Sequence, residues 1–156
     1  MSHADVLALL EAPHVGVLST IDAGGFPHSV GIYYVPVTAG EGLELQMWVY
    51  GKSQKAVNAE REPRASLLVE AGTPYQDLRG VLVRGSCRIE RDYDTVVDLG
   101  KRVYERYFEA RLGIPLSEGP IANIERQSRK RVALVLSAER FASWDHGRGP
   151  STGGGP

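Results

Sequence analysis

"LELQMWVYGKSQKAVNAEREPRASLLVE", residues 43–70, predicts a strand, a short helix and a second strand in direct succession. Apolar and polar residues alternate over 43–50, which is typical of a strand with one buried face. After the turn, Ser53 is a suitable N-cap, and Pro63 ends the helix because the residue before a proline disfavours α geometry. A helix over 54–61 therefore connects two strands of an expected sheet protein.

Four segments outside this stretch also have the apolar and β-branched composition of strands. They are residues 14–21, 27–37, 79–90 and 131–144, which together with 43–50 and 64–72 make six predicted strands. Turn-forming clusters such as "DAGG" and "TAGEG" join neighbouring strands and favour antiparallel pairing. Gly80 and Gly85 interrupt the fifth strand and indicate bulges or close backbone approach. We expect a mainly β protein of the α+β type: a six-stranded antiparallel split β-barrel with inserted helices.

Helical periodicity predicts three further helices, at residues 2–12, 92–112 and 117–131. A chain of 156 residues has the length of one domain, which we place at 1–146. The end of the chain, 147–156, is low in complexity and has no apolar residue to bury. We expect it to be disordered.

Charge and cysteine use restrict the class of protein. The formal net charge is −1, so no global field attracts nucleic acid or a membrane surface, and anion recognition must be local. Cys87 is the only cysteine, which fits a reducing cytoplasm. The chain shows neither a signal-peptide pattern nor an apolar run of membrane-spanning length. The histidines lack metal-ligand spacing, so no metal site is expected, and there is no phosphate-binding glycine loop or nucleophile elbow.

The turn after residue 50 is the best candidate for a binding site. The backbone N–H groups that follow Ser53 would lie at a helix N-terminus, where donors lack partners and the helix dipole is positive. Lys55 adds a cation in the first turn, a placement that costs up to about 1 kcal/mol unless an anion is bound. Two interpretations stay open: a phosphate site, or a solvated turn with surface lysines.

The segment "YGKSQKAVNAEREPR" at 50–64 combines a strand end, a Ser-x-Lys turn, a helix with Asn and a Pro-Arg pair. "GVLSTIDAGGFPHSVGIYYV" at 16–35, "LRGVLVRGSCRIE" at 78–90 and "SWDH" at 143–146 accompany it. Together they resemble the pyridoxamine 5′-phosphate oxidase-like split β-barrel family, in particular its flavin/deazaflavin (F420) oxidoreductase branch. The resemblance covers residues 14–146.

This resemblance implies a phosphate-binding group at the start of the helix. Ser53 and Lys55 would hold the cofactor phosphate, with Gln54 beside them and Asn58 one turn later. A basic rim would extend toward the acidic tail of F420. Its members would be Lys52, Arg61 and Arg64.

The resemblance also implies where the cofactor ring lies. The residues along the ring, on two neighbouring strands, would be Trp48, Val49, Tyr50, His28 and Val30. Trp48 and Tyr50 are equally understandable as core or interface aromatics. Arg79 and Gly80 would reach the cofactor from a second subunit, so the resemblance implies a homodimer.

Two departures from the family narrow the expected function. The FMN-binding oxidases carry an Arg near Val30 and a Gln near Gly80, and neither is present here, so pyridoxamine phosphate oxidation is not expected. We expect an oxidoreductase that binds F420 or FMN at a dimer interface and transfers hydride to or from a small organic substrate. The proton source stays open between water, His28 and Tyr33.

Two other classes of protein compete with this expectation. One is a non-catalytic protein with the same fold that binds, stores or senses flavin, F420 or haem. The other is a structural or nucleic-acid-binding barrel, which the lack of a broad basic surface disfavours.

Overall fold

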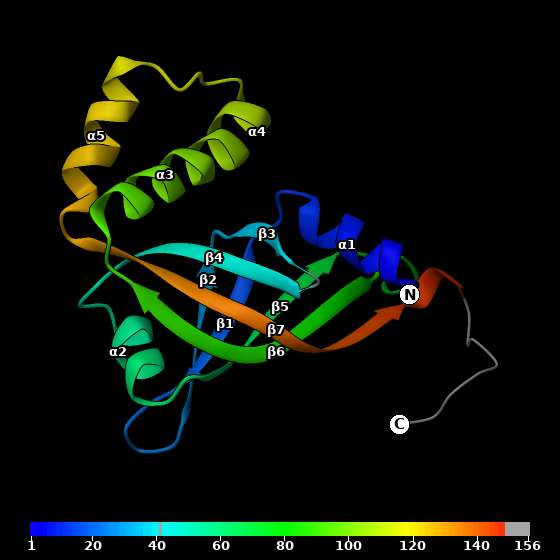
Figure 1. Cartoon of the computed structure of the whole chain (residues 1–156). Helices are drawn as coiled ribbons and strands as arrows, with labels where there is room; N and C mark the ends of the chain where they lie inside the picture. Colours follow the sequence, from blue (N-terminus) through cyan, green and yellow to red (C-terminus); the bar gives the residue numbers. More distant parts are fainter. Residues whose placement is uncertain (41, 149–156) are drawn as a thin grey trace.

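Seven antiparallel strands form one curled sheet in the computed structural model, which describes residues 1–40 and 42–148 (Figure 1). The strands are β1 (Gly16–Ile21), β2 (Pro27–Ile32), β3 (Val35–Ala39), β4 (Gly42–Tyr50), β5 (Arg64–Ala71), β6 (Arg79–Glu90) and β7 (Arg131–Asp145). Their order in space is β2-β1-β5-β6-β7-β4-β3, so β2 and β3 are the two edges of an open sheet. The expected mixed, antiparallel architecture is confirmed, but a closed six-stranded barrel is wrong.

The helices cover the two ends and one face of the sheet. They are α1 (His3–Glu11), α2 (Gln54–Arg61), α3 (Tyr93–Tyr104), α4 (Ala110–Leu112) and α5 (Glu118–Ser128). Helices α3 and α5 lie together above strands β4 and β7, and α2 lies at the end of β4 (Figure 1). Within the described ranges, no helix has both the length and the apolar character needed to cross a membrane.

The seventh strand arises because one predicted strand, 27–37, is broken at Tyr34. This tyrosine is fully buried, and its backbone leaves the sheet. The backbone N–H of Tyr34 donates to the hydroxyl of Tyr107 at 3.2 Å, and that hydroxyl lies 2.8 Å from the carbonyl oxygen of His14. The Tyr107 side chain therefore provides the hydrogen bond that a neighbouring strand would otherwise give to the Tyr34 backbone. The chain before the break pairs with β1 and the chain after it pairs with β4.

The predicted helix at 92–112 is also interrupted. A π-helical turn at Glu105–Glu109 separates α3 from α4. Such turns insert one residue into the helical repeat and change the direction of the side chains around them. Tyr107 is buried here and reaches Tyr34, while Phe108 packs edge-on against Tyr33 with ring centroids 6.2 Å apart. The interruption thus shapes the region between β2 and α3.

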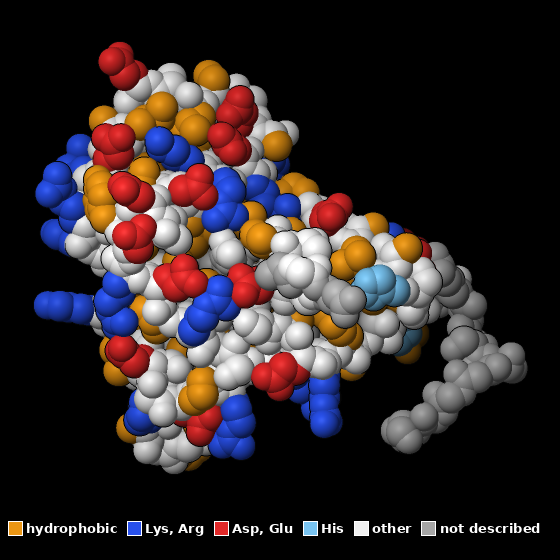
Figure 2. Space-filling model, viewed as in Figure 1, with side chains coloured by type: hydrophobic (Ala, Val, Ile, Leu, Met, Phe, Trp, Pro, Cys, Tyr) orange, Lys and Arg blue, Asp and Glu red, His pale blue; other side chains and the backbone are white. Residues whose placement is uncertain are grey.

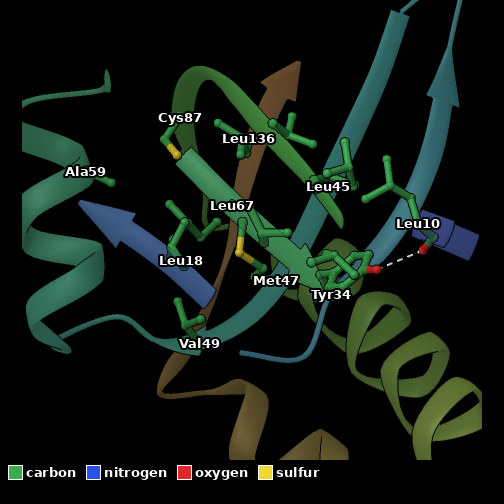
Figure 3. Packing of buried hydrophobic residues seen from close by; sticks show 14 of the residues in the cluster. Leu10, Leu18, Tyr34, Leu45, Met47, Val49, Ala59, Leu67, Cys87 and Leu136 are labelled. Carbon is green, nitrogen blue, oxygen red and sulfur yellow. Dashed lines mark hydrogen bonds between the residues drawn. The ribbon is translucent and has the colours of Figure 1, made fainter. Parts of the chain in front are cut away.

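The core fills the concave side of the sheet (Figure 3). Leu18, Leu67 and Leu136 come from three different strands and are all fully buried. The hydroxyl of Tyr34 closes the core at one end by donating to the Leu10 carbonyl oxygen at 2.9 Å (Figure 3). Burial raises the pKa of the Cys87 thiol to about 12, so this side chain is an inert core residue at neutral pH.

The C-terminal end of the described chain continues slightly past the predicted domain. Residues His146–Arg148 form a single 3₁₀ turn, in which the backbone N–H of His146 donates to the Leu78 carbonyl oxygen at 2.9 Å. The remainder of the predicted disordered tail, 149–156, lies outside the described residues.

Candidate functional site

Two pockets meet at Arg131. The first, which we call the apolar pocket, has a volume of about 560 Å³ and is lined by Val15, Gly31, Ile32, Tyr33, Trp48, Val103, Phe108 and Arg131. The second, the basic pocket, has a volume of about 980 Å³ and is lined by Tyr50, Gly51, Lys52, Ser53, Arg91, Tyr93, Ser128, Arg129, Lys130, Arg131 and Val132. Lys and Arg side chains gather along the edge of the molecule where α5 leads into β7 and next to α2 (Figure 2). An apolar cavity and a cationic one therefore lie on either side of Arg131.

The side chain of Arg131 is held between two aromatic rings. Its guanidinium carbon lies 4.0 Å from the ring centroid of Trp48 and 3.9 Å from that of Tyr50. Its Nη1 donates to the Trp48 carbonyl oxygen at 3.1 Å, and the Tyr50 hydroxyl in turn donates to Gln127 at 2.9 Å. Stacking between rings is a favourable environment for a guanidinium. The result is a fixed cation at the boundary between the two pockets.

The N-terminus of α2 adjoins the basic pocket and is open to an anion. Val57 donates the first intrahelical hydrogen bond, to the Ser53 carbonyl oxygen at 3.0 Å, so the preceding N–H groups have no helical partner. No acidic side chain occupies the first turn. Lys55 is half-buried in that turn, and its pKa is lowered by burial and by the charge of Arg131. A bound anion would offset both effects.

Ser53 occupies the predicted N-cap position, but its side chain does not cap the helix. The hydroxyl donates to the Tyr50 carbonyl oxygen at 2.7 Å instead of accepting from a helical N–H group. The expected capping bond is therefore wrong. This geometry leaves the free N–H groups of the first turn available to a ligand.

Three of the residues assigned to the cofactor are buried in the protein itself. The amide of Asn58 is fully buried, accepts from Gln54 at 2.7 Å and donates to Thr20 at 3.1 Å, so its contact with a cofactor stays a prediction. Val49 points into the core. Gly80 lies under Trp144, and a Cβ atom there would be 2.3 Å from the indole. All three residues are packed inside the protein, and none of them lines either pocket.

The predicted basic rim is assembled from different residues. Arg61 donates to the Ile21 carbonyl oxygen, and Arg64 forms an ion pair with Glu62 at 2.8 Å, so neither faces the basic pocket. Lys52 does line it. The cations that the sequence interpretation missed are Arg91, Arg129, Lys130 and Arg131. A usable signal was present, because the run "RKR" at 129–131 ends on the first residue of the last strand.

Three of the remaining predicted positions lie outside the linings of these two pockets. His28 and Val30 are half-buried on the edge strand β2, and Arg79 is exposed at the start of β6. Tyr50 and Lys52 line the basic pocket, and Trp48 lines the apolar pocket. Among residues 1–40 and 42–148, no three His, Cys, Asp or Glu side chains are placed to hold a metal ion.

The fold and the pockets define a class of small proteins in which a curled antiparallel sheet carries a ligand-sized cavity beside a helix N-terminus. The chain belongs to the Pyridoxamine 5'-phosphate oxidase family, whose sequence profile matches residues 2–145.

Three relatives place the chain within that family. It is 33% identical over 105 residues to an F420H(2)-dependent biliverdin reductase of Mycobacterium tuberculosis (strain CDC 1551 / Oshkosh), covering 66% of this chain and 70% of that protein. The crystal structure of a conserved hypothetical protein from Mycobacterium tuberculosis is 34% identical with a TM-score of 0.81, covering 100% of this chain and 93% of that one. The structure of an F420 reductase is 27% identical with a TM-score of 0.64, covering 86% and 94% respectively.

Proposed function

We propose that this protein is an oxidoreductase that binds a flavin-type cofactor, F420 in preference to FMN, and catalyses hydride transfer to or from a small organic substrate. The observation that carries this proposal is that the apolar pocket and the basic pocket lie next to each other and share Arg131. F420 has a flat deazaflavin ring, a phosphate and an acidic tail, whereas FMN ends at its phosphate. A cationic cavity of about 980 Å³ next to the N-terminus of α2 suits the longer molecule. The F420H(2)-dependent biliverdin reductase and the F420 reductase among the relatives support the same choice.

The residues present fit such a cofactor. Lys55 and the N-terminal N–H groups of α2 would bind the phosphate, and Lys52, Arg129 and Lys130 would bind the acidic tail. Trp48 and its neighbours in the apolar pocket would orient the ring and keep water away from it. The bound cofactor supplies the hydride chemistry, and the protein supplies binding and orientation.

A cofactor titration tests this proposal. F420 should bind with a dissociation constant at least about tenfold lower than that of FMN, since each additional charged contact contributes about 1.5–3 kcal/mol before screening. The difference should shrink as salt is raised, because the contacts in the basic pocket are ionic. Failure of both cofactors to bind at high micromolar concentration contradicts the proposal. Binding of haem alone would favour the storage alternative.

A second experiment with the same protein–cofactor complex distinguishes catalytic turnover from binding alone. The reduced cofactor complex is mixed with candidate acceptors in a stopped-flow instrument, with biliverdin included because a relative reduces it. An enzyme shows reoxidation whose rate depends on the acceptor. A storage protein shows none.

We further propose that the protein acts as a homodimer in the cytoplasm. The sheet face opposite the core carries a row of apolar side chains at paired positions on four strands. They are Val17, Leu68, Leu82 and Ala142, none of which is buried. A face of this kind is a suitable interface for a second copy.

The dimer predicts a mass of twice the chain in sedimentation equilibrium at micromolar concentration. Leu68→Glu should shift the protein to monomer, because it places a charge at the centre of the row. Ile114→Glu is the matched control, since Ile114 is 46% exposed and lies outside the row. A parent protein that is monomeric under the conditions of cofactor binding would contradict a shared site.

A further inference from the structure

Arg131 carries a positive charge that nothing in the described part of the chain neutralises. Among residues 1–40 and 42–148, no carboxylate lies within ion-pair distance of Arg131 or of Lys55. The two cations are close enough for the charge of Arg131 to act on Lys55, whose pKa is lowered first by burial and then by this charge. Two half-buried cations without a counter-ion are an unfavourable pair, and an anion between them removes the conflict.

The surroundings of Arg131 contain unsatisfied polar groups. Four buried side-chain atoms have no hydrogen-bond partner among the described residues, and three of them are Trp48 Nε1, Ser128 Oγ and Arg131 Nε. Ser128 is only 3% exposed and lines the basic pocket together with Arg131, while Trp48 and Arg131 line the apolar pocket. Buried donors are normally paired, so their concentration at one junction indicates a place that a ligand or its waters complete.

The geometry of Arg131 suits a binding role. The rings of Trp48 and Tyr50 and the bond to the Trp48 carbonyl oxygen fix the side chain before any ligand arrives. Little rotamer freedom is then lost on binding, and a planar guanidinium matches the oxygens of a phosphate or carboxylate. Stacking alone would explain why Arg131 is held in place, but not why it is left without a counter-ion.

We propose that Arg131, acting with Lys55, binds the anionic group of the ligand at the junction of the two pockets and thereby aligns the flat part of the ligand with the apolar pocket. This inference rests on the proposed function, since it assigns to Arg131 the phosphate of the F420-type cofactor. Arg131 is a binding residue in this scheme and takes no part in proton transfer.

The experiment compares two ligands that differ only beyond the ribityl chain. Calorimetric titration is made with F420 and with the deazaflavin riboside that has the same ring and chain but lacks the phosphate and tail. Arg131→Gln should weaken F420 binding about 10- to 100-fold and leave the riboside within about threefold. Arg131→Lys keeps the charge without the planar fork, so its affinity for F420 should be intermediate.

The matched control is Arg126→Gln, because Arg126 is an exposed α5 cation that lines neither pocket. It should change neither affinity. An equal loss for both ligands in the Arg131 variants, or no loss of F420 affinity, overturns the assignment. Thermal unfolding of each variant identifies a folding defect, in which case Arg131→Lys decides.

A third titration, with inorganic pyrophosphate, separates this inference from the proposed function. If the parent protein binds neither F420 nor the riboside, the proposed function is wrong. Arg131 is then still supported if the parent binds pyrophosphate and Arg131→Gln does not. Absence of pyrophosphate binding, or its persistence in the variant, overturns the inference as well.

Discussion

Replacement of Lys55 by alanine should weaken the binding of F420 or FMN by about 1.5–3 kcal/mol, the contribution of a hydrogen bond to a charged group. Lys55 stands in the first turn of α2, where the helix has free N–H groups and no acidic side chain. Its pKa is lowered in the unliganded protein by burial and by Arg131. The folded protein therefore holds this cation at a cost that a bound anion would offset, and we expect the lost interaction to appear in ligand affinity.

The measurement is a titration of parent and variant with the same cofactor at fixed ionic strength. Lys101→Ala is the matched control, because Lys101 is a lysine in the last turn of a different helix, α3. The control should bind with the affinity of the parent. An unchanged affinity in Lys55→Ala would show that the phosphate is bound elsewhere on the protein.

Local signals predicted the elements around the site accurately. Helix α2 has the predicted bounds because its stop signal lies inside the segment itself, in the proline at 63. The alternating pattern of β4 likewise predicted its two faces correctly. Leu45, Met47 and Val49 lie in the core, and Trp48 lies on the opposite face. Each of these outcomes depends on the backbone geometry of a few neighbouring residues.

Long-range contacts were beyond the reach of the same reasoning. The break between β2 and β3 depends on a hydrogen bond between Tyr34 and Tyr107, which are 73 residues apart. The resemblance assigned Asn58 to the cofactor, but in the folded chain its amide donates to Thr20 of β1. Neither partner can be identified from spacing along the chain.

The basic pocket is formed by segments that are far apart in the sequence and meet only in the folded chain. The basic pocket draws on the turn after β4, on Arg91 at the end of β6 and on the α5–β7 connection. The sequence indicated a cationic rim, but two of its predicted members have partners of their own. Arg61 donates to the Ile21 carbonyl oxygen, and Arg64 forms an ion pair with Glu62. Charge clusters therefore predicted the chemistry of the site better than they predicted its members.

Replacement of Gly85 by alanine should lower the free energy of unfolding by about 3 kcal/mol, near the upper range for overpacking in a well-packed region. The β6–β7 register shifts between Arg84 and Gly85, so the glycine predicted a bulge correctly. A Cβ atom at Gly85 would lie 1.8 Å from the carbonyl oxygen of Ser137 on β7. That oxygen belongs to the backbone, so relief requires the two strands to separate.

Chemical denaturation of the parent and of Gly85→Ala measures the effect. Gly119→Ala is the control with the opposite expected sign: a Cβ there meets nothing within 4 Å, and Gly119 lies in α5. Alanine in a helix should leave the stability unchanged or raise it by up to about 1 kcal/mol. If Gly85→Ala unfolds at the same denaturant concentration as the parent, β6 and β7 can open at the bulge without cost, and the close approach to Ser137 does not constrain the sheet.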